Sequence, residues 1–210
     1  GNQIEKFGWL LEARYLQIFK GDEIEFPEDG YQGEDIKDLA KEYADLNGDS
    51  LVNVSAKERK KALVDYALPK NIKKMQADME KYKIFYDKWF FESELHKSGA
   101  VKAVVDLLTK KGLTYEKEGA VWYKNKEVLT QKLLKEGKSQ KYIDNLELKD
   151  DVLIRQNANP TYFTADIAYH KNKFDRGFTT LIDVWGADHH GHVMRMKGAM
   201  DAIGYDGDKL

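Results

Sequence analysis

Apolar residues recur every three or four positions along much of the chain, which is the spacing of one face of a helix. Ile4, Phe7 and Leu11 show this spacing within a helix predicted over residues 4–20. The same pattern predicts further helices over residues 34–46, 56–82, 101–111, 162–174 and 190–203. Pro69 is expected to break or kink the third helix, because proline cannot donate the helical hydrogen bond.

The central part of the chain contains alternating residues instead. Residues 85–92 are rich in aromatic side chains and predict a strand. Residues 113–124 alternate on both sides of Glu118 and Gly119, which is typical of a β-hairpin. Residues 125–150 are rich in lysine, and we expect a helical, solvated insertion there.

In the last third, short apolar strands are predicted to alternate with helices. Residues 152–155 and 180–185 are apolar runs, and a predicted helix follows each. This order predicts an α/β fold with a parallel sheet. Ligands of such sheets bind beyond the carboxyl ends of the strands. The polar runs 157–170 and 185–192, which begin at or just after the strand ends, are therefore expected to converge on one crevice.

Tyr162 and Asp166 are candidate binding residues at the start of a predicted helix. They are four positions apart, so they share one face of the helix. A carboxylate beside a phenol suits a guanidinium, because the carboxylate accepts its forked N–H groups. An equally weighted alternative is that Asp166 caps the helix or pairs with a nearby lysine.

A second candidate cluster contains Asp188, His189, His190 and His192. Imidazole and carboxylate groups are good zinc ligands. However, neighbouring residues at a strand end point in different directions, and a histidine pair at helical spacing is absent. We therefore favour hydrogen bonding to a polar ligand or a ribose, next to a helix N-terminus that attracts anions.

Residues Asp45–Asn53 resemble the start of a calcium loop. Oxygen-bearing side chains occupy its first, third, fifth and ninth positions. Ser50 replaces the glycine of the sixth position, and Ala56 replaces the carboxylate of the twelfth. We expect a turn that ends a helix. The alternative is a noncatalytic binding module with a dockerin-like calcium loop at 45–56.

Composition excludes several classes of protein. The 210 residues include 34 Lys plus Arg against 36 Asp plus Glu, so a strong basic field for nucleic acid is absent. There is no cysteine, and hence no disulfide framework. No apolar run approaches a membrane span, and no signal peptide is evident. These features fit a cytoplasmic protein. The chain begins without methionine, so we expect a piece of a longer protein.

Four segments together resemble bacterial arginyl-tRNA synthetase, a class I aminoacyl-tRNA synthetase: Gly1–Ile4, Glu25–Gly33, Pro160–His170 and Trp185–Gly191. The resemblance implies an enzyme that activates arginine with ATP, in the presence of magnesium, and esterifies it to tRNA. It implies a Rossmann-like catalytic domain with a parallel sheet, interrupted by an inserted α+β connective subdomain.

The resemblance also implies roles for particular residues. Tyr162 and Asp166 would hold the arginine guanidinium, and His189 would contact the amino acid or the adenylate. ATP or its adenosine would lie near Gly186, Asp188 and His190. No residue is assigned as catalytic or as a metal ligand. The three residues from Asn157 replace a more usual glycine-containing turn.

The resemblance divides the chain into three parts. Residues 1–55 would be a helical segment and acidic loop, 56–150 the connective subdomain, and 151–210 the second half of the catalytic domain. The family's His-Ile-Gly-His-type and Lys-Met-Ser-Lys-type motifs, which handle phosphates, do not occur in this sequence. We therefore expect the chain to be inactive alone and to bind no cofactor. We also expect self-association or local disorder near Gly1 and Leu210.

Overall fold

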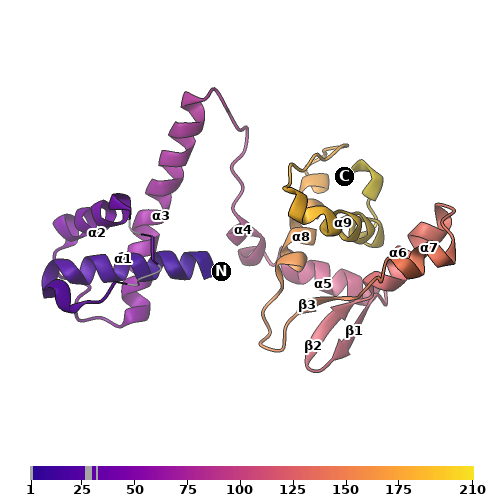
Figure 1. Cartoon of the computed structure of the whole chain (residues 1–210), viewed down its shortest axis with the longest axis horizontal. Coiled ribbons are helices and arrows are strands. Elements are labelled where there is room, and N and C mark those ends of the chain that lie inside the picture. The colour runs from indigo at the N-terminus through magenta and orange to yellow at the C-terminus, as the bar shows by residue number, and fades with distance from the viewer. Residues whose placement is uncertain (1, 27–29, 32) are drawn as a thin grey trace. The chain divides into compact units, whose positions relative to one another are not determined.

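The computed structural model describes residues 2–26, 30–31 and 33–210, and the chain forms two compact units (Figure 1). The first unit ends at Asp87 and the second begins at Lys88. Expectations that depend on Gly1, on 27–29 or on Gln32, including part of the acidic loop, lie outside the described residues. The three-part division at residues 55 and 150 stays a prediction.

The first unit is helical. Its elements are α1 (Asn2–Lys20), a 3₁₀ turn (Gly21–Glu23), α2 (Glu34–Asn47) and α3 (Ala56–Lys81). The three predicted helices are therefore confirmed. Helix α1 packs on both α2 and α3 and contributes Leu11 and Tyr15 to the core, together with Ile36 and Leu63. Burying each of these large side chains contributes about 1.5–3 kcal/mol of stability.

Helix α3 continues through Pro69, so the predicted break is wrong. The ring removes the hydrogen bond that the carbonyl of Asp65 would accept within the helix. Both residues are exposed, which lets water satisfy that carbonyl. The cost of the missing bond is therefore too small to end the helix.

The turn between α2 and α3 is held by the buried guanidinium of Arg59. Its Nε donates to the carbonyl of Leu51 at 2.8 Å, and its Nη2 donates to those of Val52 and Val54 at 3.1 and 2.7 Å. Its Nη1 pairs with Glu12 of α1 at 2.8 Å. The guanidinium of Arg59 thus donates hydrogen bonds to the carbonyl groups that a metal ion would otherwise find in this turn.

Two of the four candidate calcium ligands in this region have other partners. Asp45 lies in α2 and pairs with Lys41, and the side chain of Asn47 donates to the carbonyl of Tyr43. Within the described ranges, no group of three or more His, Asp or Glu side chains is arranged to hold a metal ion. The structure therefore lends no support to the calcium-binding alternative.

The second unit combines helices with a small sheet. Its elements are α4 (Glu92–Lys97), α5 (Ala100–Lys110), β1 (Thr114–Lys117), β2 (Ala120–Tyr123), α6 (Asn125–Lys135), α7 (Gln140–Asn145), β3 (Asp151–Ile154), α8 (Tyr162–Asp175), α9 (His190–Ile203) and 3₁₀ turns at Ala187–His189 and Gly207–Lys209. The strands form one antiparallel sheet in the order β1-β2-β3. The fold is therefore α/β and mostly helical.

The predicted hairpin is confirmed. Lys117 pairs with Ala120 across the turn, and Glu118 and Gly119 both have positive φ angles, 53° and 72°. Two consecutive positive φ angles are typical of the tight turns whose twist matches a hairpin.

The parallel arrangement expected for the last third is absent from the described part of the chain. β3 is a strand, but it pairs antiparallel with β2. Residues 180–185 have no ladder partner there, and Ile182 and Val184 are 84% and 95% exposed. Residues 85–91 also form no strand, and Glu92 already begins α4. An apolar run predicts an extended backbone, but a strand also needs a hydrogen-bonding neighbour.

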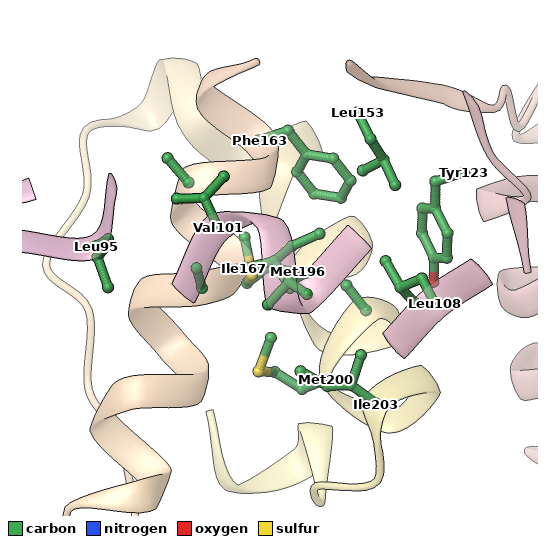
Figure 2. Packing of buried hydrophobic residues seen from close by; sticks show 14 residues of the cluster. Leu95, Val101, Leu108, Tyr123, Leu153, Phe163, Ile167, Met196, Met200 and Ile203 are labelled. Carbon is green, nitrogen blue, oxygen red and sulfur yellow. The ribbon is translucent and has the colours of Figure 1, made fainter. Parts of the chain in front are cut away.

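The core of the second unit lies between α5, α8 and α9 and the inner side of the sheet (Figure 2). Its largest members include Leu108, Tyr123, Leu153, Ile167 and Met196, which are all fully buried.

The lysine-rich region is part of the second unit's packing, so the prediction of a solvated insertion is wrong. Helix α6 packs on α9. A Cβ atom on Gly198 of α9 would lie 2.7 Å from Leu129 of α6, which shows how closely the two helices approach. Lys132 adds ion pairs to Asp201 and Asp208 at 2.8 and 3.3 Å.

No helix in the described ranges combines the length and apolarity needed to cross a membrane.

Candidate functional site

The first turn of α8 is anchored to strand β3 by two threonines. Thr161 caps the helix, and its hydroxyl donates to the carbonyl of Val152 at 2.8 Å. The hydroxyl of Thr164 donates to the carbonyl of Leu153 at 2.7 Å. Because these bonds are buried or half-buried, they fix the position from which Tyr162 and Asp166 project.

A cavity of about 670 Å³ opens beside this turn. Residues of α4, α8 and α9 and of the turn before α9 line it. Of the predicted site residues, the cavity wall contains Tyr162, Asp166, Asp188 and His189. The two polar runs therefore do converge, although no parallel sheet brings them together.

The other two predicted residues lie nearby but outside the wall. Gly186 precedes the 3₁₀ turn, where its carbonyl accepts a hydrogen bond from the amide of His189 at 3.0 Å. His190 is exposed and begins α9. Nδ1 of His189 lies 3.0 Å from the carboxylate of Asp188.

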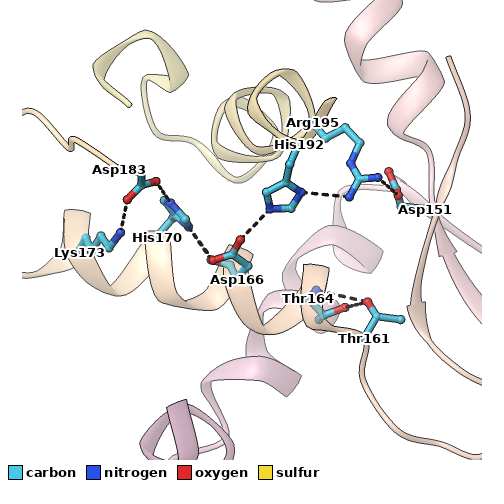
Figure 3. Close-up of polar contacts among 9 residues, drawn as sticks. All are labelled: Asp151, Thr161, Thr164, Asp166, His170, Lys173, Asp183, His192 and Arg195. Atoms are coloured by element: carbon cyan, nitrogen blue, oxygen red, sulfur yellow. Dashed lines mark hydrogen bonds and ion pairs between the residues drawn. The ribbon is translucent and has the colours of Figure 1, made fainter. Parts of the chain in front are cut away.

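Asp166 is held from two sides by histidines. Its Oδ2 lies 2.7 Å from Nε2 of His192, and its Oδ1 lies 3.4 Å from Nδ1 of His170 (Figure 3). Burial alone would raise the pKa of Asp166, but the hydrogen bonds from His170 and His192 outweigh burial and hold the pKa well below its usual range. Asp166 is therefore a carboxylate, and it remains about one third exposed toward the cavity.

His192 joins Arg195 to Asp166. Its Nδ1 lies 3.1 Å from Nη2 of Arg195, and a guanidinium can only donate, so Nδ1 accepts and Nε2 donates to the carboxylate of Asp166. Arg195 in turn pairs with Asp151 of β3 at 3.1 Å.

His170 is buried, with 1% of its surface exposed, and its two ring nitrogens face acceptors. Nδ1 lies 2.8 Å from the carbonyl oxygen of Asp166, and Nε2 lies 2.5 Å from the carboxylate of Asp183. Burial would lower the pKa of His170, but the hydrogen bonds to Asp166 and Asp183 prevail and raise it to about 9. Asp183 also binds Lys173 at 2.6 Å, and its pKa is lowered by these partners against the effect of burial.

The result is a continuous polar network. It contains the basic groups of Lys173, His170 and Arg195 and the carboxyl groups of Asp183, Asp166 and Asp151, with His192 between Arg195 and Asp166. A carboxylate has about four acceptor positions. Asp166 therefore retains capacity for another donor from the cavity.

The sequence indicated Asp166 and included His192 in the second candidate cluster, but it did not predict that His170 and His192 hold Asp166. The spacing of four between Asp166 and His170 was a usable signal, because it places both side chains on one helix face. Asp166 and His192 are 26 positions apart, so no local sequence pattern predicts their contact. Among the described residues, Asp166 pairs with two histidines and not with a lysine.

Comparison with known proteins identifies the relatives of the chain. Arginine–tRNA ligases of Ruminiclostridium cellulolyticum and of Caldanaerobacter subterraneus subsp. tengcongensis are 52% and 54% identical to it over all of its length. A solved structure described as an arginyl tRNA synthetase, from Campylobacter jejuni, covers the whole chain with a TM-score of 0.79 and 33% identity. No family profile matches the sequence.

The chain is therefore homologous to a segment of an aminoacyl-tRNA synthetase, a class of ligase. The relatives that it matches are arginine–tRNA ligases, as the resemblance of the sequence implied. The chain spans about a third of the length of the curated relatives, 35% and 34%, and 42% of the Campylobacter chain.

Proposed function

We propose that the chain provides the arginine-recognition part of a ligase that activates arginine with ATP and transfers it to tRNA. The proposal rests on one observation above all. Asp166 is ionised, is fixed by two histidines and faces a cavity of about 670 Å³ that Tyr162 also lines. A guanidinium is a planar cation with forked donors, so it matches a fixed carboxylate better than an ammonium group does.

Tyr162 and His189 complete the proposed arginine site. Tyr162 is 67% exposed at the start of α8, so its ring is available to a ligand in the cavity. His189 lies across the same cavity, where it would contact the arginine backbone or the adenylate.

ATP is proposed to bind along the turn that contains Gly186 and Asp188 and ends at His190. The amide groups at the start of α9 favour an anion such as a phosphate. Within the longer ligase, residues 151–210 would complete a Rossmann-like domain in which residues 180–185 pair with a further strand. The printed sequence lacks both phosphate-handling motifs, so the 210 residues alone should not catalyse arginine-dependent pyrophosphate exchange.

The central test uses Asp166→Ala in the ligase that contains this segment. Losing the charge partner of a desolvated guanidinium costs about 2–5 kcal/mol. The KM for arginine should therefore rise roughly 30-fold or more, at about 1.4 kcal/mol per tenfold change. The KM for ATP should change little.

Two further variants make this test specific. Tyr162→Ala changes an exposed side chain, so it should raise the arginine KM without lowering the melting temperature. Asp175→Asn is the matched control, because Asp175 is a carboxylate on the same helix that pairs with Lys171 away from the cavity. An unchanged arginine KM in folded Asp166→Ala would refute the proposed function.

A further inference from the structure

We propose that Asp183 and His170 are positioning residues for arginine recognition: Asp183 holds His170, and His170 holds Asp166 in the orientation and charge state that receive the guanidinium. This inference rests on the proposed function and extends it to two residues that do not line the cavity. Figure 3 shows the chain of contacts from Lys173 to Asp166.

The first step concerns the protons of His170. Both of its ring nitrogens face oxygen atoms that can only accept, a carbonyl oxygen on one side and an ionised carboxylate on the other. Each nitrogen must therefore carry a proton, so the ring is an imidazolium cation. The side chain is almost fully buried, so protein groups balance this charge in place of water.

The second step concerns the groups around this cation. From its own helix it faces Asp166, Lys173 and the ring of Tyr169, and from the segment before α9 it faces Asp183 and the ring of Trp185. The two carboxylates stabilise the cation, and Lys173 opposes it. Asp183 makes the shorter of the two carboxylate contacts, 2.5 Å against 3.4 Å.

The third step leads from His170 to the ligand. The imidazolium forms an ion pair with Oδ1 of Asp166 at 3.4 Å while His192 donates to Oδ2 at 2.7 Å, so the carboxylate is oriented before any ligand arrives. A binding group that is already oriented loses less entropy on binding. If His170 were neutral, one of its nitrogens would face an acceptor without a proton, and Asp166 would lose its buried counter-charge.

The competing explanation is that Asp183 only fastens residues 180–185 to α8. That role would affect stability alone. A positioning role would also link arginine binding to the protonation of His170, so the pH profile separates the two explanations.

The test uses Asp183→Asn in the ligase that contains this segment, with arginine and ATP KM values measured from pH 6 to 10. In the unchanged protein, the arginine KM should rise as the pH passes about 9, where His170 loses its proton. In Asp183→Asn this rise should occur at least one pH unit lower, so the arginine KM at pH 9 should increase about fivefold or more. The ATP KM should stay within twofold, and Asp183→Glu should restore part of the loss.

Lys173→Gln is a second variant, for which the pH midpoint should move in the opposite direction. Lys173 lowers the pKa of His170, so its removal should move the rise in arginine KM to higher pH. Titration of the His170 ring by NMR should follow the kinetic midpoint in each variant. Asp175→Asn should leave the midpoint unchanged.

The outcomes are distinct. If neither folded variant moves the midpoint of the pH dependence of the arginine KM, the positioning role is wrong and Asp183 only stabilises the packing of residues 180–185 on α8. If Asp183→Asn does not fold, the Lys173→Gln result alone decides. If Asp166→Ala leaves the arginine KM unchanged, the proposed function itself fails, whatever the Asp183 and Lys173 variants show.

Discussion

The guanidinium of Arg59 lies 2.8 Å from the carboxylate of Glu12, and the side chains of both are about one tenth exposed. This pair joins α3 to α1, while the remaining guanidinium N–H groups bind the carbonyls of the turn that precedes α3. One side chain thus satisfies several buried acceptors that no helix or strand supplies with a donor.

We expect Arg59→Met to destabilise the first unit by about 3–5 kcal/mol, because it leaves Glu12 and the turn carbonyls buried without their donor. Hydrogen exchange in α1 and α2 measures this loss. Lys57→Met is the matched control, since Lys57 is exposed two residues earlier on α3. Equal protection of the α1 and α2 amides in the two variants would show that the turn does not depend on Arg59. Added calcium should not restore the protection lost in Arg59→Met.

The stability of the second unit should fall at alkaline pH. The pKa of His170 is raised to about 9 in the folded chain, against about 6.5 when unfolded. Such a group stabilises the folded state fully below about pH 6.5, and this contribution is lost as the pH rises through about 9. The total is on the order of 3 kcal/mol.

The alkaline loss can be followed by urea unfolding monitored at Trp185, which packs beside His170. His170→Gln should be less stable at neutral pH and should lack most of the decline between pH 6.5 and 9. A parallel decline in both proteins would assign the pH dependence to other groups.

Ala158→Gly should stabilise the second unit by about 0.5–1 kcal/mol. Ala158 has a φ of +61° in the turn between β3 and α8, a conformation that glycine adopts without strain. Ala103→Gly provides a control of opposite sign, because Ala103 is exposed within α5 and glycine weakens a helix interior. Thermal unfolding should therefore move in opposite directions for the two variants, and a lower melting temperature for Ala158→Gly would contradict the prediction.

Self-association of the chain is expected to involve Ile182 and Val184, the most exposed large aliphatic side chains among the described residues. Replacing both with lysine should lower the average mass measured by light scattering at high concentration. Leu134→Lys, on the exposed side of α6, serves as the control. If the double variant associates as strongly as the original chain, the contact lies elsewhere.

The sequence predicted the helices because their apolar spacing is a local property. It predicted the hairpin because Glu118 and Gly119 suit its turn. It failed for residues 180–185, where the pattern indicates an extended backbone but cannot show whether a neighbouring strand is present. It predicted that the region of α6 is helical but not that α6 is packed in the second unit, because the many lysines obscured Leu129 and Leu133, which are four apart and both buried.

For the candidate site, the sequence indicated Tyr162 and Asp166 through their spacing and through resemblance. The spacing of four between Asp166 and His170 also carried a signal, because it places both side chains on one face of α8. The sequence did not indicate the contact between Asp166 and His192, because that depends on how α9 packs against α8. Arg59 was missed for the same reason: nothing in a local pattern distinguishes a buried arginine from the many exposed basic residues of α3.

The attachment of Asp183 to α8 orders more than one side chain. Leu181, Asp183 and Trp185 are buried or half-buried, whereas Ile182 and Val184 between them are exposed. This is the two-residue alternation of a strand, present in a segment without a ladder partner in the described part of the chain. A strand that pairs with this segment would find its register already defined. Because the segment is already extended, pairing would cost less conformational entropy than pairing with a disordered loop.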